Sequence, residues 1–331
     1  MNTSPPSIDA LRQAASGGDP RARFALGEAL LRAGGGLADY RDAEEAITAA
    51  HAGGEAEATA RLAMLAAMGV TAPADWRKAL ILLAQAAARG SAAAQGQLRA
   101  LASDGDVGEG GGDDDWAALA ATVDLTRWTT MPPKRVLSAT PRVATIQGFV
   151  SGPVCDWIIG RAKAGIAPAR VFDAATGAAT VTDARSNSAV EFAFADVDVV
   201  LALTRAYIAT SIDVPLDGLE PTQVLHYAVG QAFAPHYDFM DPLVPGYALE
   251  AQRGGQRVAT FLIYLNDAFE GGETDFPLIR LRAKAPPGGA LYFANVDGAG
   301  APDRRTLHAG LAPTSGEKWL LSQWVRIRPQ R

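Results

Sequence analysis

The chain has 331 residues, of which 48% are apolar and 20% are charged, and its formal net charge at pH 7 is −6. This composition is that of a globular protein and excludes the collagen-like and intrinsically disordered classes. The length predicts two domains, since a domain usually holds about 100 to 200 residues. Nucleic acid and anionic membranes are not expected as partners, because a surface for either needs clustered Lys and Arg.

Features that report on the compartment predict a cytoplasmic protein. Cys155 is the single cysteine, so no disulfide within the chain is possible and a reducing compartment is expected. The N-terminus has Pro5, Pro6 and Asp9 where a signal peptide needs a basic start and an apolar run. No stretch approaches the ~18 or more consecutive apolar residues of a membrane span.

The first part of the chain repeats with a period of 36 residues. Similar segments begin at Gly18, Gly54 and Gly90, and Ala38–Arg41 recurs as Ala74–Arg77. Ala and Leu at helical spacing, with Gly at the joints, predict stacked helical hairpins.

These repeats resemble the Sel-one-like family, relatives of the tetratricopeptide repeats, in the phrases Ala25-Leu26-Gly27 and Ala86-Ala87-Ala88-Arg89-Gly90. The resemblance places a helical repeat domain in residues 1–103. Two roles stay open for it, because a solenoid architecture does not determine function. One is a concave surface that recruits a peptide or protein substrate, and the other is a scaffold or dimerisation element that contacts no ligand.

Residues 104–115 are rich in Gly and Asp, and this composition predicts a flexible acidic linker. A metal site on the three aspartates Asp113, Asp114 and Asp115 is the alternative, and the solvated linker is the favoured interpretation.

Residues 116–331 instead show alternating or β-branched runs separated by Gly, Pro and Asp clusters. Many short strands between turns are typical of a sandwich or a double-sheet jelly roll. The fold class predicted for the whole chain is therefore α+β multidomain, with α-helical hairpin repeats before a jelly roll with flanking helices. The predicted strands are 223–229, 257–266, 290–295 and 318–327, and the predicted helices are 152–164 and 196–209.

A candidate metal site lies in this second domain. His236 and Asp238 are two residues apart at the end of a strand-like run, so both side chains project from the same face of an extended backbone. His308 follows two strand candidates that can bring it back beside this pair. Two imidazoles and one carboxylate on one face of an octahedral ion leave positions open, as in non-haem iron oxygenases. Zinc would bind the same ligands, so these residues alone leave the metal open.

Short phrases of this domain occur in an order and at spacings that carry a family resemblance. They are Tyr227-Ala228-Val229-Gly230, Pro235-His236-Tyr237-Asp238, Arg257-Val258-Ala259-Thr260, Tyr264-Leu265-Asn266, Gly271-Gly272-Glu273-Thr274-Asp275-Phe276-Pro277, His308-Ala309-Gly310 and Gly316-Glu317-Lys318-Trp319. Through them, residues from about 140 to 328 resemble the prolyl 4-hydroxylase branch of the 2-oxoglutarate-dependent oxygenases. The resemblance implies a double-stranded β-helix, a form of jelly roll, in an oxygenase domain that spans residues 116–331.

The resemblance also implies the metal and the co-substrate. It assigns iron(II) to His236, Asp238 and His308, and it assigns the distal carboxylate of 2-oxoglutarate to Lys318. A buried dicarboxylate needs a compensating cation, and an ammonium in a low-dielectric barrel forms a strong charge-assisted bond with it. Without the motif, Lys318 would be interpreted as an exposed strand lysine.

Three hydroxyl side chains, Tyr227, Thr260 and Tyr264, match positions that in relatives surround the same carboxylate. Each is alternatively an ordinary barrel residue. Dioxygen is the second co-substrate that the resemblance implies, and ascorbate is a candidate reductant.

The substrate contacts follow the family pattern less closely. Trp324 matches an aromatic position at the substrate mouth, and Arg185 with Asn187 lies in a phrase that resembles an Arg-x-Ser contact motif. Asn187 replaces that serine, and Arg326 replaces a histidine that relatives often carry, so the resemblance does not identify the substrate. The long segment 239–256 between two strands predicts a loop that closes over the substrate as a lid.

The expected function is that of a dioxygenase that hydroxylates an unactivated carbon, with succinate and carbon dioxide as co-products. The expected substrate is a prolyl residue in a peptide or protein. A hydroxylase of a free amino acid or small metabolite is one alternative. The other is a catalytically silent binding protein that acts through its repeats, which the intact ligand set and Lys318 disfavour.

Overall fold

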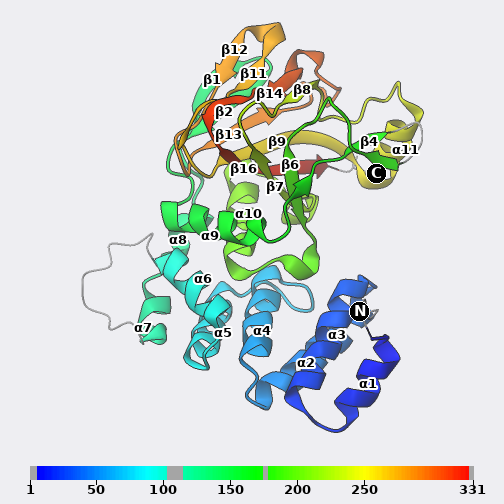
Figure 1. The fold of residues 1–331 in the computed structure, drawn as a ribbon, viewed down its shortest axis with the longest axis vertical. Helices are drawn as coiled ribbons and strands as arrows, with labels where there is room; N and C mark the ends of the chain where they lie inside the picture. The colour runs from blue at the N-terminus through cyan, green and yellow to red at the C-terminus, as the bar shows by residue number, and fades with distance from the viewer. Residues whose placement is uncertain (1–5, 103–114, 174–177, 328–331) are drawn as a thin grey trace. The chain divides into compact units, whose positions relative to one another are not determined.

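The computed structural model describes residues 6–102, 115–173 and 178–327, which belong to two compact units (Figure 1). Unit 1 is drawn from residues 1–129 and 193–206, and unit 2 from residues 130–192 and 207–331. Residues 104–114 of the predicted linker lie outside the described residues, and Asp115 is the N-cap of the helix that follows. Within the described part of the chain, no helix is long and apolar enough to span a membrane.

Unit 1 is a series of helical hairpins. The second, fourth and sixth helices begin at residues 20, 56 and 92, which reproduces the period of the sequence. The assignment of these hairpins to the Sel-one-like family stays a prediction. The helices are α1 (Ile8–Ser16), α2 (Pro20–Ala33), α3 (Leu37–Ala52), α4 (Ala56–Met68), α5 (Trp76–Ala88), α6 (Ala92–Ala102), α7 (Trp116–Ala121) and α8 (Leu125–Thr129).

Close packing and buried polar contacts hold these helices together. A Cβ atom on Gly27 of α2 would lie 2.4 Å from the Ile47 side chain of α3, so glycine permits this approach. Arg61 of α4 pairs with the buried Glu28 of α2 and donates a hydrogen bond of 2.8 Å to the carbonyl of Ala195. The bond to Ala195 explains why residues 193–206 group with the helical unit. Residues 116–129 group with it because α7 packs on α5 and α6. The sequence had instead placed a domain boundary at residue 116.

Unit 2 contains two antiparallel sheets (Figure 1). The larger sheet consists of β1 (Arg135–Ala139), β2 (Arg142–Ile146), β3 (Ala167–Pro168), β6 (Ser188–Phe192), β7 (Thr222–Tyr227), β9 (Gln256–Tyr264), β13 (Ala290–Ala294) and β16 (Lys318–Ile327). The smaller sheet consists of β8 (Phe233–His236), β11 (Thr274–Phe276), β12 (Leu281–Ala283) and β14 (His308–Gly310). Short two-stranded ribbons pair β10 (Phe269–Gly271) with β15 (Pro313–Gly316) and β4 (Val171–Asp173) with β5 (Ala178–Thr180).

The strand order identifies the architecture of this unit. The larger sheet runs β1-β2-β13-β9-β16-β7-β6-β3, and the smaller runs β12-β11-β14-β8. Buried side chains of both sheets, such as Leu262, Leu320 and Phe276, belong to one core cluster. Two antiparallel sheets with crossovers around one core form a jelly roll, so the predicted α+β class is confirmed.

Most elements predicted for residues 116–331 are present. The predicted strands correspond to β7, β9, β13 and β16, and the predicted helices to α9 (Gly152–Lys163) and α10 (Val199–Ile212). The segment 239–256 was predicted to be a loop, but it contains the helix α11 (Pro245–Gly254). The loop prediction was wrong because Pro245 begins this helix and Gly255 caps its end, which are positions that helices favour for these residues.

Candidate active site

The pairing of two short strands brings two histidines together. β8 ends at His236 and β14 begins at His308, and these residues stand opposite each other in the antiparallel register. The carboxylate oxygens of Asp238 lie 3.6 Å from His236 Nε2 and 3.5 Å from His308 Nε2. One donor atom of each residue lies within 4.8 Å of the others. In the described ranges, this is the one group of three or more His, Cys, Asp and Glu residues with metal-binding geometry.

Backbone carbonyls fix the tautomer of both histidines. His236 Nδ1 lies 2.8 Å from the carbonyl oxygen of Ala234, and His308 Nδ1 lies 3.0 Å from that of Thr306. Because a carbonyl only accepts, each Nδ1 donates its hydrogen, and in the neutral imidazole the lone pair is then on Nε2. Both imidazoles are therefore prepared to bind a metal through the nitrogen that lies near Asp238.

The charge state of the cluster suits a divalent metal. Burial, reinforced by His308, lowers the pKa of His236 to about 3, so this imidazole is neutral near pH 7. Burial alone would raise the pKa of Asp238, but His308, His236 and a hydrogen bond from Thr260 outweigh it and hold that pKa below its usual value. Neutral imidazoles and one carboxylate are the donor set of non-haem iron(II) sites with open positions.

Thr260 of β9 contacts this cluster rather than Lys318. Its hydroxyl donates a hydrogen bond of 2.6 Å to Asp238 Oδ2 and accepts one of 3.0 Å from Asn295 Nδ2. The register explains the placement, because Thr260 stands opposite Trp324 on β16, six residues along that strand from Lys318. Sequence reasoning missed Asn295, and the available signal was a polar residue directly after an apolar strand.

Lys318 begins β16 directly opposite Tyr227 of β7. Its side chain is fully buried, and its Nζ has no hydrogen-bond partner among the described residues. The Nζ lies 4.7 Å from the ring centre of Tyr227 and 5.4 Å from that of Tyr264. Burial, together with the nearby Lys284, lowers the pKa of Lys318 to about 7. An unpaired buried ammonium is costly, so this position fits an anionic ligand.

The two tyrosines predicted at the co-substrate flank Lys318 as neutral phenols. Burial raises the pKa of Tyr227 to about 12 and also raises the pKa of Tyr264. The hydroxyl of Tyr264 lies 2.9 Å from Thr274 Oγ1. A Cβ atom on Gly310 would lie 3.1 Å from the hydroxyl oxygen of Tyr227, so the absence of a side chain there makes room for this ring.

These groups share one narrow cavity inside unit 2. Its lining includes His236, Asp238 and His308, together with Lys318 and Tyr227. The arrangement fits a small anion that contacts a metal at one end and the Lys318 ammonium at the other.

A wider cavity of about 830 Å³ adjoins the narrow one and shares several lining residues with it. Its wall contains aromatic side chains and residues of α11. Among the lining residues are Arg185, Phe233, Tyr237, Tyr247, Glu250 and Trp324. A substrate that enters here reaches the candidate metal ligands directly, because His236 and Asp238 line both cavities.

The structure separates the three predicted substrate residues. Arg185 and Trp324 line both cavities, whereas Asn187 lines neither. Asn187 is buried and accepts a hydrogen bond of 3.3 Å from Arg185 Nε. The Arg185 guanidinium also lies 4.7 Å from the ring centre of Phe233. Asn187 therefore supports the Arg185 side chain through a hydrogen bond. A direct substrate contact by Asn187 stays a prediction.

An ion-pair network beside Trp324 was not predicted. Glu220 accepts two hydrogen bonds from Arg257, of 2.6 and 2.8 Å, and one of 2.6 Å from Arg326 Nε. Arg326 also bonds Glu250 of α11 at 3.2 Å, and the Arg257 guanidinium lies 3.6 Å from the ring centre of Trp324. The network could not be predicted from the sequence because its members are far apart along the chain.

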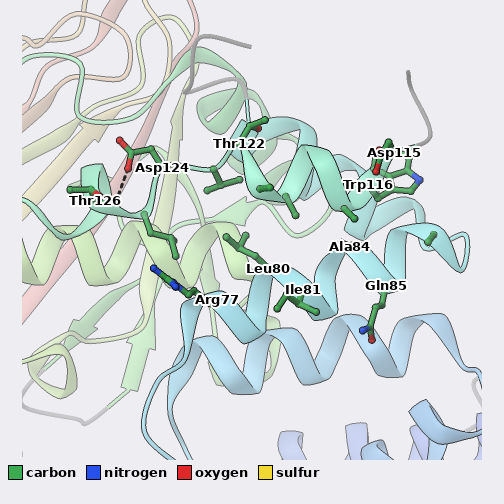
Figure 2. A pocket seen from close by; sticks show the side chains of 16 residues that line it. Arg77, Leu80, Ile81, Ala84, Gln85, Asp115, Trp116, Thr122, Asp124 and Thr126 are labelled. Atoms are coloured by element: carbon green, nitrogen blue, oxygen red, sulfur yellow. Dashed lines mark hydrogen bonds between the residues drawn. The ribbon is translucent and has the colours of Figure 1, made fainter. Parts of the chain in front are cut away.

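Unit 1 has a groove of its own, shown in Figure 2. It has a volume of about 990 Å³ and lies between α5 on one side and α7 and α8 on the other. Leu80, Ile81 and Ala84 line it from α5, and Ala120 lines it from α7. The Ile81 side chain is 59% exposed. The groove is therefore largely apolar.

Comparisons with known proteins identify relatives of this chain. The sequence profile of the 2OG-Fe(II) oxygenase superfamily matches residues 222–326. Prolyl 4-hydroxylase 1 of Arabidopsis thaliana is 31% identical over 218 residues, which cover 61% of this chain and 75% of that protein. The structure of a viral collagen prolyl hydroxylase of Paramecium Bursaria Chlorella virus-1 with 2OG is 29% identical, covering 56% of this chain and 95% of that chain with a TM-score of 0.43. For a Sel1 repeat protein of Oxalobacter formigenes, the identity is 25%, the coverage 34% of this chain and 47% of that chain, and the TM-score 0.28.

The chain belongs to the 2OG-Fe(II) oxygenase superfamily. It is a 2-oxoglutarate-dependent dioxygenase whose curated relatives include prolyl 4-hydroxylases. The family implies iron(II) and 2-oxoglutarate. The cluster of His236, Asp238 and His308 fits that iron, and the unpaired Lys318 ammonium fits that dicarboxylate.

Proposed function

We propose that this dioxygenase hydroxylates a prolyl residue within a peptide or protein. The observation that carries the proposal is the unpaired Lys318 ammonium in the same narrow cavity as His236, Asp238 and His308. One dicarboxylate can then contact both the metal and a cation. The prolyl substrate is supported by the similarity to prolyl 4-hydroxylases, among them one at 31% identity.

In this proposal, His236, Asp238 and His308 hold iron(II) through two Nε2 atoms and one carboxylate. The bound iron would couple oxidative decarboxylation of 2-oxoglutarate by dioxygen to hydroxylation of an unactivated carbon, with succinate and carbon dioxide as co-products. Three protein ligands on one face leave positions open for the co-substrates.

Lys318 binds and orients the distal carboxylate of 2-oxoglutarate. Binding supplies the anionic partner that its ammonium lacks among the described residues. Tyr227 and Tyr264 lie beside the ammonium and keep that end of the cavity closely packed. Leu225 and Leu262, which line the same cavity, exclude water from the reacting groups.

The wider cavity supports a peptide substrate over a free amino acid. Its volume of about 830 Å³ lies in the range of roughly 300 to 1,000 Å³ that is usual for sites of drug-sized ligands. A single amino acid would leave most of this space empty, whereas a short peptide would fill it. Arg185 and Trp324 are the proposed substrate contacts because they line both cavities, and Asn187 supports Arg185.

The proposal is tested by incubating the full chain with iron(II), 2-oxoglutarate and ascorbate. A panel of proline-containing peptides and free proline are offered in parallel, and the products are analysed by mass spectrometry. We expect one added oxygen atom on a peptide proline and one succinate for each hydroxylated proline. Oxygen added only to free proline would instead identify the protein as a hydroxylase of a free amino acid. No succinate with any substrate, and metal binding unchanged by His236→Ala, would leave only the binding-protein alternative.

The helical unit is proposed to recruit the peptide substrate. The support is the apolar groove beside α5, at which Ile81 is largely exposed. The test compares the KM of wild type and Ile81→Glu for a protein substrate and for a short peptide that contains only the target site. Recruitment predicts a higher KM for the protein substrate alone. An unchanged KM for both would favour the scaffold or dimerisation role.

Two smaller proposals rest on the sequence. The lone Cys155 supports a reducing compartment such as the cytoplasm. The family resemblance supports ascorbate as the reductant that maintains iron(II), and the test is whether product formation without ascorbate stops after few turnovers while the ascorbate-supplied reaction continues.

A further inference from the structure

We infer that Thr260 and Asn295 are positioning residues that fix the Asp238 carboxylate in the orientation that the metal requires. The inference rests on the proposed metal site and goes beyond it, because neither side chain is a candidate ligand. It also gives Thr260 a role different from the co-substrate contact that the family resemblance implies.

The hydrogen bonds in this chain of three residues have a defined direction. Asn295 Nδ2 can only donate, and it donates to Thr260 Oγ1 at 3.0 Å. The single hydroxyl hydrogen of Thr260 is therefore directed to Asp238 Oδ2, at 2.6 Å. That distance falls within the roughly 2.5 to 2.7 Å that is usual for an O–H group donating to a charged carboxylate.

The three side chains are isolated from water, and backbone hydrogen bonds fix the position of Asn295. Their exposed fractions are 0% for Asn295, 1% for Thr260 and 4% for Asp238. The Asn295 amide donates to the carbonyl of Val258 at 2.8 Å, and the Asn295 carbonyl accepts from the Asp303 amide at 3.0 Å. With Asn295 fixed by the backbone, this buried chain of hydrogen bonds restrains the Asp238 carboxylate at its other end.

This restraint matters because an aspartate carboxylate rotates easily about its last torsion angle. In the described structure, Thr260 is the side chain that donates a hydrogen bond to Asp238. The bond to Oδ2 fixes the plane of the carboxylate and leaves Oδ1 near His236 Nε2, at 3.6 Å. Without it, both carboxylate oxygens could turn to the metal and take a position that a co-substrate needs.

The test measures metal affinity directly, so it does not depend on turnover. The metal-free full chain is titrated with Mn(II), and the unbound Mn(II) is followed by electron paramagnetic resonance. Thr260→Val keeps the shape of the side chain and removes the hydroxyl, and we expect it to weaken Mn(II) binding by about 10- to 100-fold. Thr260→Ser keeps the hydroxyl and should restore affinity close to wild type.

A matched control separates positioning from general damage. Thr222 of β7 is equally buried, and its hydroxyl donates a hydrogen bond of 2.6 Å to Gln323 Oε1, outside the metal cluster. Thr222→Val therefore removes a comparable bond and should leave Mn(II) affinity unchanged. Asn295→Ala should weaken binding less than Thr260→Val and add little to it in the double variant, because both act through one bond.

The outcomes distinguish this inference from the proposed metal site. If wild type binds Mn(II) and His236→Ala does not, but Thr260→Val binds as tightly as Thr222→Val, the positioning role is wrong and the metal site stands. If His236→Ala also binds like wild type, the metal site itself is wrong. Should Thr260→Val fail to fold, as judged by its melting temperature, Thr260→Ala compared with Thr260→Ser decides the question in the same way.

Discussion

Lys318 stands directly opposite Tyr227 in the register of β16 and β7, and its buried ammonium lies 4.7 Å from the centre of the Tyr227 ring. A cation over an aromatic face recovers part of the hydration that burial removes. The ring carries no net charge, however, so much of the cost of burying the ammonium remains until an anion binds. Lys318 therefore links stability, pH and co-substrate binding.

Replacing Lys318 by Met should stabilise the chain in the absence of ligands. Folding lowers the pKa of this side chain from 10.5 to about 7, and each pKa unit is worth about 1.4 kcal/mol. The folded state binds the proton less tightly than the unfolded state, so the penalty is complete below pH 7 and fades as the pH rises toward 10.5. Lys318→Met should therefore raise the free energy of unfolding by a few kcal/mol at pH 7, and by less at pH 9.

Chemical denaturation of wild type and Lys318→Met at both pH values checks this prediction. The same variant should lose 2-oxoglutarate binding. A variant that is less stable than wild type at pH 7 would show that the ammonium is well paired in the free protein.

The affinity for 2-oxoglutarate should fall as the pH rises above 7. Only protonated Lys318 attracts the distal carboxylate, and its pKa of about 7 in the free protein means that binding must take up a proton at higher pH. The affinity of the metal-loaded protein should drop by up to about tenfold per pH unit above 7. Calorimetry in buffers of different ionisation enthalpy measures both the affinity and the proton uptake.

Lys318→Arg is the control for this pH dependence, because a guanidinium stays charged throughout the range. Its affinity for 2-oxoglutarate should be lower overall but nearly independent of pH between 7 and 9. A slope equal to that of wild type would assign the pH dependence to another group.

A methyl group at Gly310 should displace Tyr227. The added Cβ atom would lie 3.1 Å from the Tyr227 hydroxyl oxygen, and overpacking of this kind typically costs about 1 to 3 kcal/mol. Gly310→Ala should raise the KM for 2-oxoglutarate at least about fivefold. Tyr227→Phe removes the clashing atom, so the double variant should bind 2-oxoglutarate better than Gly310→Ala does. Additive losses in the double variant would contradict this contact.

The segment that contains α11 should close over the bound substrate. Gln256 holds its base by two hydrogen bonds to the backbone of Met240, of 2.7 and 2.8 Å, and Glu250 of α11 reaches Arg326 of β16 at 3.2 Å. Adding metal, a 2-oxoglutarate analogue and a peptide substrate should slow proteolytic cleavage within residues 245–254. Glu250→Ala should remove most of this protection.

Glu45→Ala, at an exposed position of α3, is the matched control for the loss of a glutamate. It should be protected as wild type is. If the full ligand set leaves the cleavage rate of wild type unchanged, the segment is not a lid.

Residue spacing was sufficient to predict part of the site. His236 and Asp238 share a face because they are two apart on an extended backbone, which the sequence shows directly. The position of His308 required more, because only the pairing of β14 with β8 places it opposite His236. The order of the family motifs supplied that information in the sequence.

Contacts that depend on strand register could not be predicted. Thr260 and Asn295 are 35 residues apart and meet through a cross-strand hydrogen bond. The sequence therefore did not show that the Thr260 hydroxyl bonds Asp238, and a contact of Thr260 with the co-substrate stays a prediction. Asn187 shows the same limit, because its motif did not reveal the hydrogen bond that its side chain accepts from Arg185. Side-chain direction within a known motif is fixed by packing, not by spacing.

The most direct test of the central claim compares hydroxylated proline and succinate formed by wild type, His236→Ala and His226→Ala. His226 pairs with Glu317 at 2.7 Å and lies outside the metal cluster, so it controls for the loss of an imidazole. We expect wild type and His226→Ala to form one hydroxyproline per succinate in a peptide, and His236→Ala to form neither. Hydroxyproline formation by His236→Ala at the wild-type rate would contradict the proposed site.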